Sequence, residues 1–357
     1  MTNHAGLLEP SSISVVLPTY RRPTMLRHCL QSIERQSRKD LIAQVLVSEN
    51  SDDQASEQVA KSFADNLPIH FLRQDPPLSP CEHFVLLSRL VNTEFTALIG
   101  DDDMWGRYHL EEAARAYRAA PNINSFFGEA IIVCNERCYP LRRYTGSLLQ
   151  VPPATTGVTD LEDFYLWNAR DTAMHCMAHT PLNMWSSVTR ASVLTAAFEM
   201  TFGDPELVAN PSSDKMLIWK LATAGPLAIS REITLFYREH PRSAMASFLD
   251  QQAETTYLQD YQLTRRIEAE ARALGFDPVA DWRTTFQRAQ DLGIAEHLHT
   301  WTPLLYRQLI RGEDPLAEPQ PSSKPAHSLR QRLLNLRHLL TPPLFSRIAI
   351  PRPSRTF

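Results

Sequence analysis

The sequence predicts an α/β fold in which a mostly parallel sheet is flanked by helices. Short apolar runs rich in β-branched residues, beginning with Ile13–Leu17, alternate along the chain with segments whose apolar residues recur at helical spacing. Repeated strand–helix–strand order favours parallel strands, because each crossover helix returns the chain to the same edge of the sheet. Ligands of such sheets bind beyond the carboxyl ends of the strands.

The first two elements set this pattern. The run at 13–17 is stopped by Pro18, as expected of a strand buried on both faces, and Pro23 opens a segment with a helical apolar stripe. Further strands are predicted, in order, at 42–47, 69–72, 95–99, 126–133 and 227–237. Further helices are predicted around Val59 and Phe63, around Phe84 and Leu87, and over 108–120 and 214–224.

Composition divides the chain into three parts. Residues 1–245 carry the alternating pattern and form the predicted α/β domain, within which 134–212 is irregular and rich in aromatic residues, Met and Pro. This irregular stretch is expected to cover the open edge of the sheet. Residues 246–312 have a helical pattern, and 313–357 contain a Pro/Ser-rich linker and a basic tail.

The basic tail is electrostatically distinct, since seven Lys and Arg residues and no acidic residue follow Glu318. Within it, 329–340 places four leucines along one side of a predicted helix with arginines interleaved. Such a helix can lie on an anionic membrane surface, dock onto its own domain or bind a partner protein. Peripheral contact with the inner face of a membrane is therefore one of three open alternatives.

The overall composition excludes several classes of protein. A formal net charge of −4 argues against a generally basic nucleic-acid binder. No apolar run approaches the roughly 20 residues of a membrane-spanning helix, and the N-terminus has no signal-peptide core, so a cytoplasmic location is expected. The 5 cysteines are odd in number and scattered, which favours reduced thiols.

Three consecutive acids, Asp101–Asp103, are the strongest chemical signal. They directly follow the predicted strand at 95–99 and Gly100. Because like charges packed together are costly without a cation, this cluster predicts a site for Mg²⁺ or Mn²⁺ that leaves room for phosphate oxygens. The alternative is a solvated acidic turn or a set of helix caps.

Two more polar segments follow predicted strands. The turn 47–53 contains Glu49 and two aspartates, whose carboxylates can accept hydrogen bonds from a nucleobase or a ribose. The segment 18–22 contains Thr19, Tyr20 and two arginines, which can face a diphosphate. Helix capping and surface solvation are the alternatives for these residues, but three polar strand ends at one edge of a sheet favour a site.

These three segments, 14–22, 47–53 and 97–105, resemble the opening of family 2 glycosyltransferases of the GT-A fold. The resemblance implies that residues 1–245 bind a nucleotide sugar and carry the active site, with 134–212 on the acceptor side. It assigns the nucleotide to Pro18, Thr19, Tyr20 and Arg22, the base to Glu49, the ribose to Asp101 and a metal ion to Asp103, with Asp102 shared. The family usually has aspartate where this chain has Glu49.

Two later segments extend the resemblance. Residues 210–222 are similar to the segment that carries the family's general base, which would be Asp214, although an aspartate at this point can also cap the helix that follows. Residues 236–243 are similar to a Tyr-Arg-x-His block, in which His240 would bind the metal and Arg238 the diphosphate. A surface or hydrogen-bonded structural histidine is the alternative for His240.

The resemblance implies an inverting, metal-assisted glycosyltransferase that uses Mn²⁺ or Mg²⁺. Its donor would be a nucleotide-diphosphate sugar and its acceptor a glycan or a lipid-linked hydroxyl, as in polysaccharide biosynthesis. Sugar-nucleotide nucleotidyl transfer is a rival, although its glycine-rich, lysine-containing loop is missing near the first strand. A non-catalytic scaffold of the same fold is another. The chain has no phosphate loop, dinucleotide fingerprint or nucleophile elbow, which excludes P-loop ATPases, dinucleotide oxidoreductases and serine hydrolases.

Overall fold

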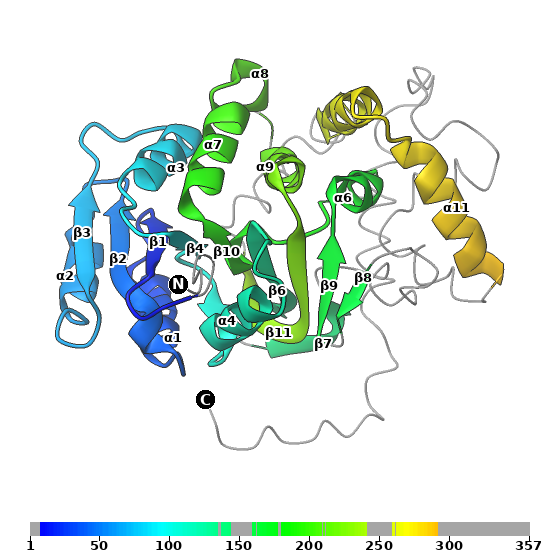
Figure 1. The fold of residues 1–357 in the computed structure, drawn as a ribbon. Helices are drawn as coiled ribbons and strands as arrows, with labels where there is room; N and C mark the ends of the chain where they lie inside the picture. The colour runs from blue at the N-terminus through cyan, green and yellow to red at the C-terminus, as the bar shows by residue number, and fades with distance from the viewer. Residues whose placement is uncertain are drawn as a thin grey trace, which may run out of the picture.

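An eleven-stranded mixed sheet forms the centre of the protein, here a computed structural model (Figure 1). The structure describes residues 8–134, 137–143, 159–161, 163–177, 180–208, 210, 212–240, 259–260 and 262–291. The strands are β1 (Ile13–Thr19), β2 (Ile42–Glu49), β3 (Ile69–Arg73), β4 (Phe95–Leu98), β5 (Met104–Trp105), β6 (Ser125–Cys134), β7 (Arg137–Arg143), β8 (Thr159–Leu161), β9 (Phe164–Trp167), β10 (Ser187–Arg190) and β11 (Leu227–Glu239).

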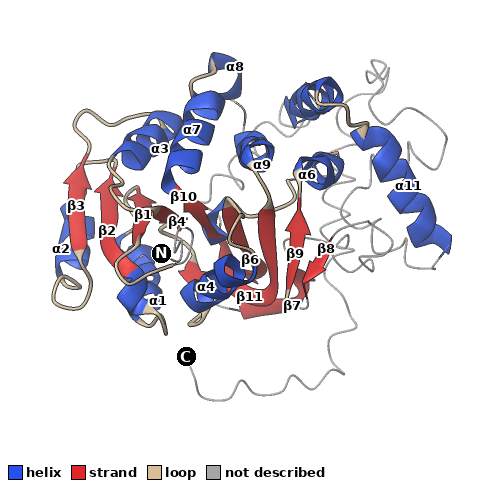
Figure 2. Cartoon of the chain, viewed as in Figure 1, coloured by secondary structure: helices blue, strands red, loops and turns tan. Residues whose placement is uncertain are grey.

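Helices cover both faces of this sheet (Figure 2). They are α1 (Pro23–Glu34), α2 (Gln54–Lys61), α3 (Pro80–Arg89), α4 (His109–Ala119), α6 (Ala169–Cys176), α7 (Ala191–Phe202), α8 (Pro205–Val208), α9 (Ser213–Ala224) and α11 (Pro278–Asp291), with short 3₁₀ turns η1 (Lys39–Leu41) and η3 (Met184–Ser186). The structure confirms the predicted α/β fold.

Strand order explains why the sheet is mostly parallel. The path is β3-β2-β1-β4-β10-β6-β11-β9-β8, and its first four members are parallel neighbours. Strand β10 is antiparallel to both β4 and β6, so β6 and its parallel partner β11 keep the direction of β1. Followed through all pairings, seven of the eleven described strands run one way. Their carboxyl ends therefore meet at a common edge.

Alternate residues of the central strands face two separate cores. Val15, Val45 and Ala97 pack with apolar residues of α1, α2 and α4, whereas Val16 and Leu46 pack with those of α3, α7 and α9. This is the period-two geometry of a strand covered by helices on both faces. The strands can therefore be uniformly apolar, which is why they are easily recognised in the sequence.

The interpretation of 134–212 as a cover for the sheet edge is only partly right. Strands β8 and β9 do extend the sheet beyond β11, but β10 lies in the middle, between β4 and β6. Strand β10 has four residues and only Val188 among them is apolar, so it is too short to show a period. The same stretch contains α6 and α7, whose positions were not predicted.

The described part of the C-terminal extension is helical. Residues 262–273 form a helix, α11 follows, and both contribute to a third apolar cluster with α6 and α9. The linker and basic tail predicted at 313–357 lie outside the described residues. No described helix combines the length and apolar character needed to cross a bilayer. Cys29, Cys81 and Cys176 are buried and form no disulfide, as expected of reduced thiols.

Candidate functional site

Strand register brings the predicted polar segments together. In the parallel pair β1–β4, Val16 lies opposite Leu98, so three residues further on Thr19 lies level with Asp101. In the parallel pair β1–β2, Thr19 lies opposite Glu49. The site is therefore a consequence of three neighbouring strands ending together at one edge of the sheet.

Asp101 is the centre of this convergence. Its Oδ2 accepts hydrogen bonds from the Thr19 hydroxyl at 2.8 Å and the Tyr20 N–H at 3.3 Å, and its Oδ1 accepts one from Arg22 at 2.9 Å. Burial raises the pKa of Asp101 to about 6, and the charge of Asp102 adds to this while Arg22 opposes it. The predicted neighbours Thr19, Tyr20 and Arg22 are thus all in contact with the first acid.

Asp102 lies between the side chains of Arg22 and His240. Arg22 Nη1 donates to its Oδ2 at 2.8 Å, and His240 Nε2 lies 3.0 Å from the same oxygen. Burial alone raises the pKa of Asp102, but the hydrogen bond from His240 and the charge of Arg22 outweigh it and lower that pKa. His240 follows the end of β11, so a fourth strand end contributes to the cluster.

Asp103 is fully buried and incompletely hydrogen-bonded. Its Oδ1 accepts the backbone N–H of Arg238 at 2.9 Å, whereas its Oδ2 has no hydrogen-bond partner among the described residues. Burial, together with the charge of Asp102, raises the pKa of Asp103 well above its usual range. A buried carboxylate oxygen without a partner is costly, and a cation or a donor group of a ligand would relieve that cost.

Arg238 contacts the acid cluster through its backbone N–H. While its N–H binds Asp103, its guanidinium Nη2 lies 3.5 Å from Met104 Sδ. Gly100 leaves space beside the acids, since a Cβ there would stand 3.0 Å from Asp102 Oδ1 and 3.4 Å from Asp103 Oδ2. No group of three or more His, Cys, Asp and Glu side chains among the described residues is already arranged around one metal position.

Glu49 has the same incomplete bonding as Asp103. It is fully buried, and its Oε1 accepts the Ser51 hydroxyl at 2.6 Å and the Arg21 N–H at 3.2 Å. Its Oε2 has no hydrogen-bond partner among the described residues. Two buried acids at this edge, Glu49 and Asp103, therefore each have one carboxylate oxygen with no hydrogen-bond partner among the described residues.

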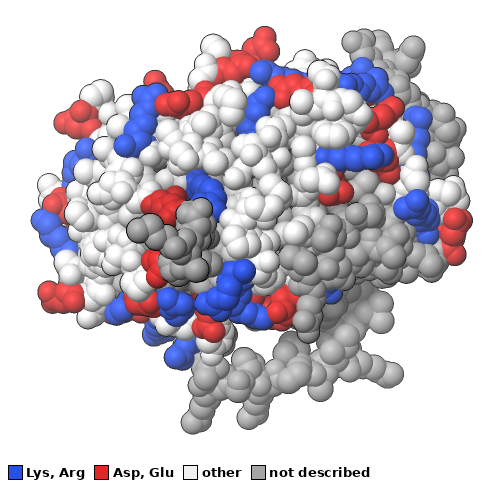
Figure 3. Space-filling model, in the orientation of Figure 1, with Lys and Arg blue, Asp and Glu red and all other residues white. Residues whose placement is uncertain are grey.

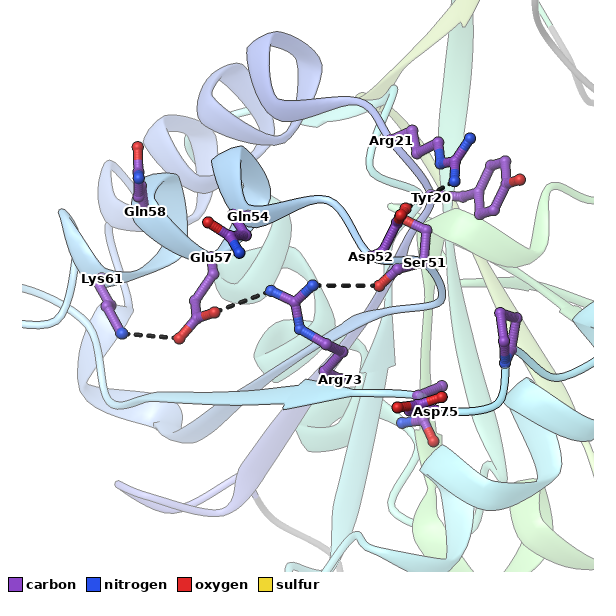
Figure 4. Close-up of a pocket in the computed structure, with 12 residues that line it drawn as sticks. Tyr20, Arg21, Ser51, Asp52, Gln54, Glu57, Gln58, Lys61, Arg73 and Asp75 are labelled. Carbon is purple, nitrogen blue, oxygen red and sulfur yellow. Dashed lines mark hydrogen bonds and ion pairs between the residues drawn. The ribbon is translucent and has the colours of Figure 1, made fainter.

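A pocket of about 830 Å³ opens between the ends of β1, β2 and β3 and the helix α2 (Figure 4). Tyr20, 54% exposed, stands at its wall with the Arg21 guanidinium 5.6 Å from its ring centre. The residues that line it are Tyr20, Arg21, Ser51, Asp52, Gln54, Glu57, Gln58, Lys61, Arg73, Gln74, Asp75 and Pro77. The pocket and the acid cluster share the segment that follows β1.

Sequence reasoning missed the contribution of β3. Arg73 closes one side of the pocket, where it binds Glu57 at 2.9 Å and the Ser51 carbonyl oxygen at 3.4 Å (Figure 4). Gln74 and Asp75 follow at the end of the same strand. Their position after a parallel strand was the available signal, since ligands of such sheets lie at strand ends.

Asp214 lies in the first turn of α9, one residue inside the helix start at Ser213, so it is not the capping residue. Its Oδ1 accepts the Lys215 N–H at 2.9 Å. Burial raises the pKa of Asp214 to about 6; Lys215 opposes this shift and Asp260 adds to it. Within the described chain, no hydrogen bond or ion pair joins Asp214 to Asp101–Asp103, so the structure does not bring it into their network.

Aromatic and polar residues within 134–212, the stretch expected on the acceptor side, differ in exposure. Trp167 is buried and stacks on His175, with ring centres 3.9 Å apart, and Asn183 is buried at the start of η3. Trp185 is half-buried and lies next to Gly100. On the face drawn in Figure 3, basic and acidic side chains of described residues are interspersed.

Comparison with known proteins finds similarity to glycosyltransferases. Residues 14–175 match the family model described as glycosyl transferase family 2. Abequosyltransferase RfbV of Salmonella typhimurium strain LT2 is 29% identical over 93 residues, which are 26% of this chain and 28% of that relative. The matched part thus spans less than a third of the length of this curated relative.

Solved structures show the same architecture at low sequence identity. S. aureus TarS superposes with a TM-score of 0.54 at 12% identity, covering 82% of this chain and 44% of that one. A structure of S. aureus TarS 1–349 in complex with UDP-GlcNAc gives 0.51 at 13% identity, covering 85% and 92%. The expected GT-A fold is therefore confirmed. In sequence, the similarity to family 2 glycosyltransferases covers residues 14–175 of this chain.

Proposed function

We propose that this chain transfers a sugar, with inversion, from a nucleotide-diphosphate donor to a hydroxyl of a glycan or a lipid-linked acceptor. The observation that carries the proposal is the convergence of Thr19, Arg22, Asp101 and His240 from three strand ends beside a pocket. The match of residues 14–175 to the glycosyl transferase family 2 model supports the reaction class. The TarS complex with UDP-GlcNAc supports a nucleotide-sugar donor.

The donor would lie along the edge from the pocket to the acid cluster. In this arrangement the nucleoside occupies the pocket with its base against Tyr20. The oxygen Oε2 of Glu49, which has no partner among the described residues, accepts an N–H of the base. Asp101, already fixed by Thr19 and Arg22, accepts the ribose hydroxyls. Arg22 and Arg238 supply positive charge for the diphosphate.

The donor set of the acid cluster fits a hard divalent cation such as Mn²⁺ or Mg²⁺. Asp103 has a buried oxygen without a partner, and His240 presents an imidazole nitrogen to Asp102. Asp103 and His240 would hold the ion, with Asp102 between them. When bound, the ion would supply charge that stabilises the departing diphosphate.

Asp214 is the proposed general base. The acceptor oxygen attacks the anomeric carbon while the bond from that carbon to the diphosphate oxygen breaks, and its electron pair leaves with the nucleoside diphosphate. The acceptor proton passes to the Asp214 carboxylate. A pKa raised to about 6 suits this role, because the group is mostly ionised at neutral pH and is a stronger base than an ordinary aspartate.

A donor panel tested with Mn²⁺ or Mg²⁺ examines the proposal directly. Transfer and donor hydrolysis are measured for the wild type, Asp103→Ala and Asp214→Asn, with Asp65→Ala as the control, since Asp65 is exposed at the other end of β3. Both site variants are expected to lose about 100-fold or more in transfer, while only Asp103→Ala loses metal-dependent donor binding. Full transfer by Asp214→Asn would remove Asp214 from the mechanism.

The same panel separates the rival functions. Release of pyrophosphate from a nucleoside triphosphate and a sugar phosphate would indicate nucleotidyl transfer. Donor binding with neither transfer nor hydrolysis would indicate a scaffold. Residues 329–340 lie outside the described residues, and their contact with anionic lipid, like a cytoplasmic location, stays a prediction of the sequence.

A further inference from the structure

The first turn of α9 is held by a segment from far along the chain. Lys215, next to Asp214, has a side chain that is only 1% exposed, and its ammonium forms an ion pair with Asp260 Oδ1 at 2.8 Å. The same ammonium donates to the Thr264 hydroxyl at 3.1 Å. Asp260 and Thr264 belong to a segment that is helical at 259–260 and 262–273, here called the docking helix.

The docking helix follows α9 along its length. Beyond the Lys215 contacts, Trp219 Nε1 and Lys220 Nζ both donate to Glu270 Oε2, at 2.7 and 2.6 Å. The contacts advance together along both helices, so the two run in the same direction. Leu263 and Ile267 pack in the apolar cluster shared with Trp219. The two helices are therefore joined at two polar points, one at the first turn of α9 and one further along.

The two polar contacts between the helices differ in their distance from Asp214. A buried ammonium must be paired, and an apolar pair of the same volume would serve packing equally well or better. The pair Lys215–Asp260 is therefore poorly explained by stability alone. It lies one residue from Asp214, whereas the Glu270 contacts lie five and six residues away from it.

We infer that Asp260 is a positioning residue, which through Lys215 fixes the first turn of α9 and thereby aims the Asp214 carboxylate. This inference rests on the proposed function of Asp214 as the base. It makes the docking helix part of the catalytic unit, although it follows the α/β pattern by some twenty residues. A misplacement of the base by about 1 Å is enough to cost roughly 100-fold in rate.

The test compares Asp260→Asn with Glu270→Gln, which loosens the same two helices away from Asp214. Asp260→Asn is expected to lower kcat by about 10- to 100-fold with the donor KM within about twofold, and Asp260→Glu to restore part of the rate. Glu270→Gln is expected to lower the melting temperature while leaving kcat within about twofold. Losses of kcat that simply follow the melting temperature in both variants would overturn the inference.

Hydrogen exchange gives a readout that does not depend on activity. The amides of residues 213–217 are expected to exchange faster in Asp260→Asn than in Glu270→Gln, and unchanged exchange there would overturn the positioning role even if transfer fell. Should Asp260→Asn fail to fold, Thr264→Val removes only the hydroxyl partner of Lys215 and is expected to give the same pattern more weakly. If Asp260→Asn exchanges faster at 213–217 but Asp214→Asn keeps full transfer activity, the proposed role of Asp214 as the base is contradicted. The conclusion that Asp260 holds the first turn of α9 would then still stand.

Discussion

The acid cluster and the first turn of α9 hold their carboxylates in opposite ways. In the cluster, three acids from one turn are bound by groups at or just beyond the ends of β1 and β11, and both Arg22 and His240 contact Asp102. At α9, one acid stands beside an ion pair between the buried Lys215 and the partly exposed Asp260. The cluster is a network of several acids and their partners, whereas the turn at α9 is held through one side chain, Lys215, which contacts Asp260 and Thr264.

Because of this difference, substitutions in the cluster should change ligand affinity, whereas substitutions at α9 should change the rate of the chemical step. In a network of like charges, removing one cation leaves several carboxylates to repel one another, so both stability and ligand affinity should suffer. At a single positioned base, a change should act on the chemical step and leave ligand affinity alone. Substitutions in the two regions are therefore expected to fall into two kinetic classes.

Replacement of Arg22 should have the largest effect of the substitutions considered below. Arg22→Met leaves Asp101 and Asp102 without their shared guanidinium, so we expect the unfolding free energy to fall by about 2–3 kcal/mol at pH 7. Transfer should fall about 100-fold, mainly through donor affinity. Chemical denaturation and donor titration measure the two effects.

Arg21 provides the matched control for this prediction. It is the preceding residue, and its ion pair with Asp52 is exposed to solvent. Arg21→Met should therefore leave the unfolding free energy unchanged, because exposed pairs contribute little. Equal destabilisation by both variants would show that the cluster does not depend on Arg22.

The pH dependence of the transfer rate should report the ionisation of Asp214 in the first turn of α9. Burial raises the pKa of Asp214 to about 6, so kcat should rise about tenfold per unit below pH 6 and level off above it. Lys215 and Asp260 are the charged groups that act on this carboxyl. Because the folded pKa lies above the unfolded value, the contribution of Asp214 to stability is largest in acid and is lost as the pH rises through 6.

The control for this prediction is Asp214→Asn, measured over the same pH range. Its residual transfer should show no limb near pH 6, and its stability relative to the wild type should be higher at pH 7 than at pH 4. A limb that persists unchanged in Asp214→Asn would assign the titration to another group.

The donor side could be predicted from the sequence because its parts are local. Thr19, Glu49 and Asp101 each lie at or just beyond the end of an apolar strand, and parallel order is enough to place such ends together. The pocket wall from β3 was missed because Arg73 and Asp75 form no distinctive motif. Strand β10 was missed because it is short and its neighbours in the sheet are distant in sequence.

The α9 side could be predicted only in part. Asp214 was found through its resemblance to a family segment, but its partner contact was not, since Lys215 and Asp260 are 45 residues apart along the chain. Nothing near Asp260 marks it in the sequence as a partner of a buried lysine. A pairing between two helices depends on their packing, which no local period encodes.

Glu49 should show a smaller effect, confined to the donor. Glu49→Gln keeps an oxygen that accepts from Ser51 and Arg21, but it replaces the unpartnered oxygen Oε2 by an amide nitrogen, which donates. The donor KM should rise about tenfold with kcat nearly unchanged, because a base N–H then meets another donor. Glu57→Gln, on the same pocket wall but paired with Arg73, should change KM by less than about twofold. An unchanged KM in Glu49→Gln would move the base elsewhere.

The smallest effect is expected from a single methyl group beside the acids. In Gly100→Ala the new Cβ would stand 3.0 Å from Asp102 Oδ1 and 3.4 Å from Asp103 Oδ2, so the Asp102 carboxylate must shift by a few tenths of an ångström. Metal-dependent donor affinity should fall roughly fivefold, about 1 kcal/mol. Gly106→Ala is the control, since its Cβ would make only ordinary contacts from 3.5 Å outward. Titration calorimetry with a nucleoside diphosphate and Mn²⁺ measures both variants, and equal affinities would show that the network absorbs small displacements of its acids.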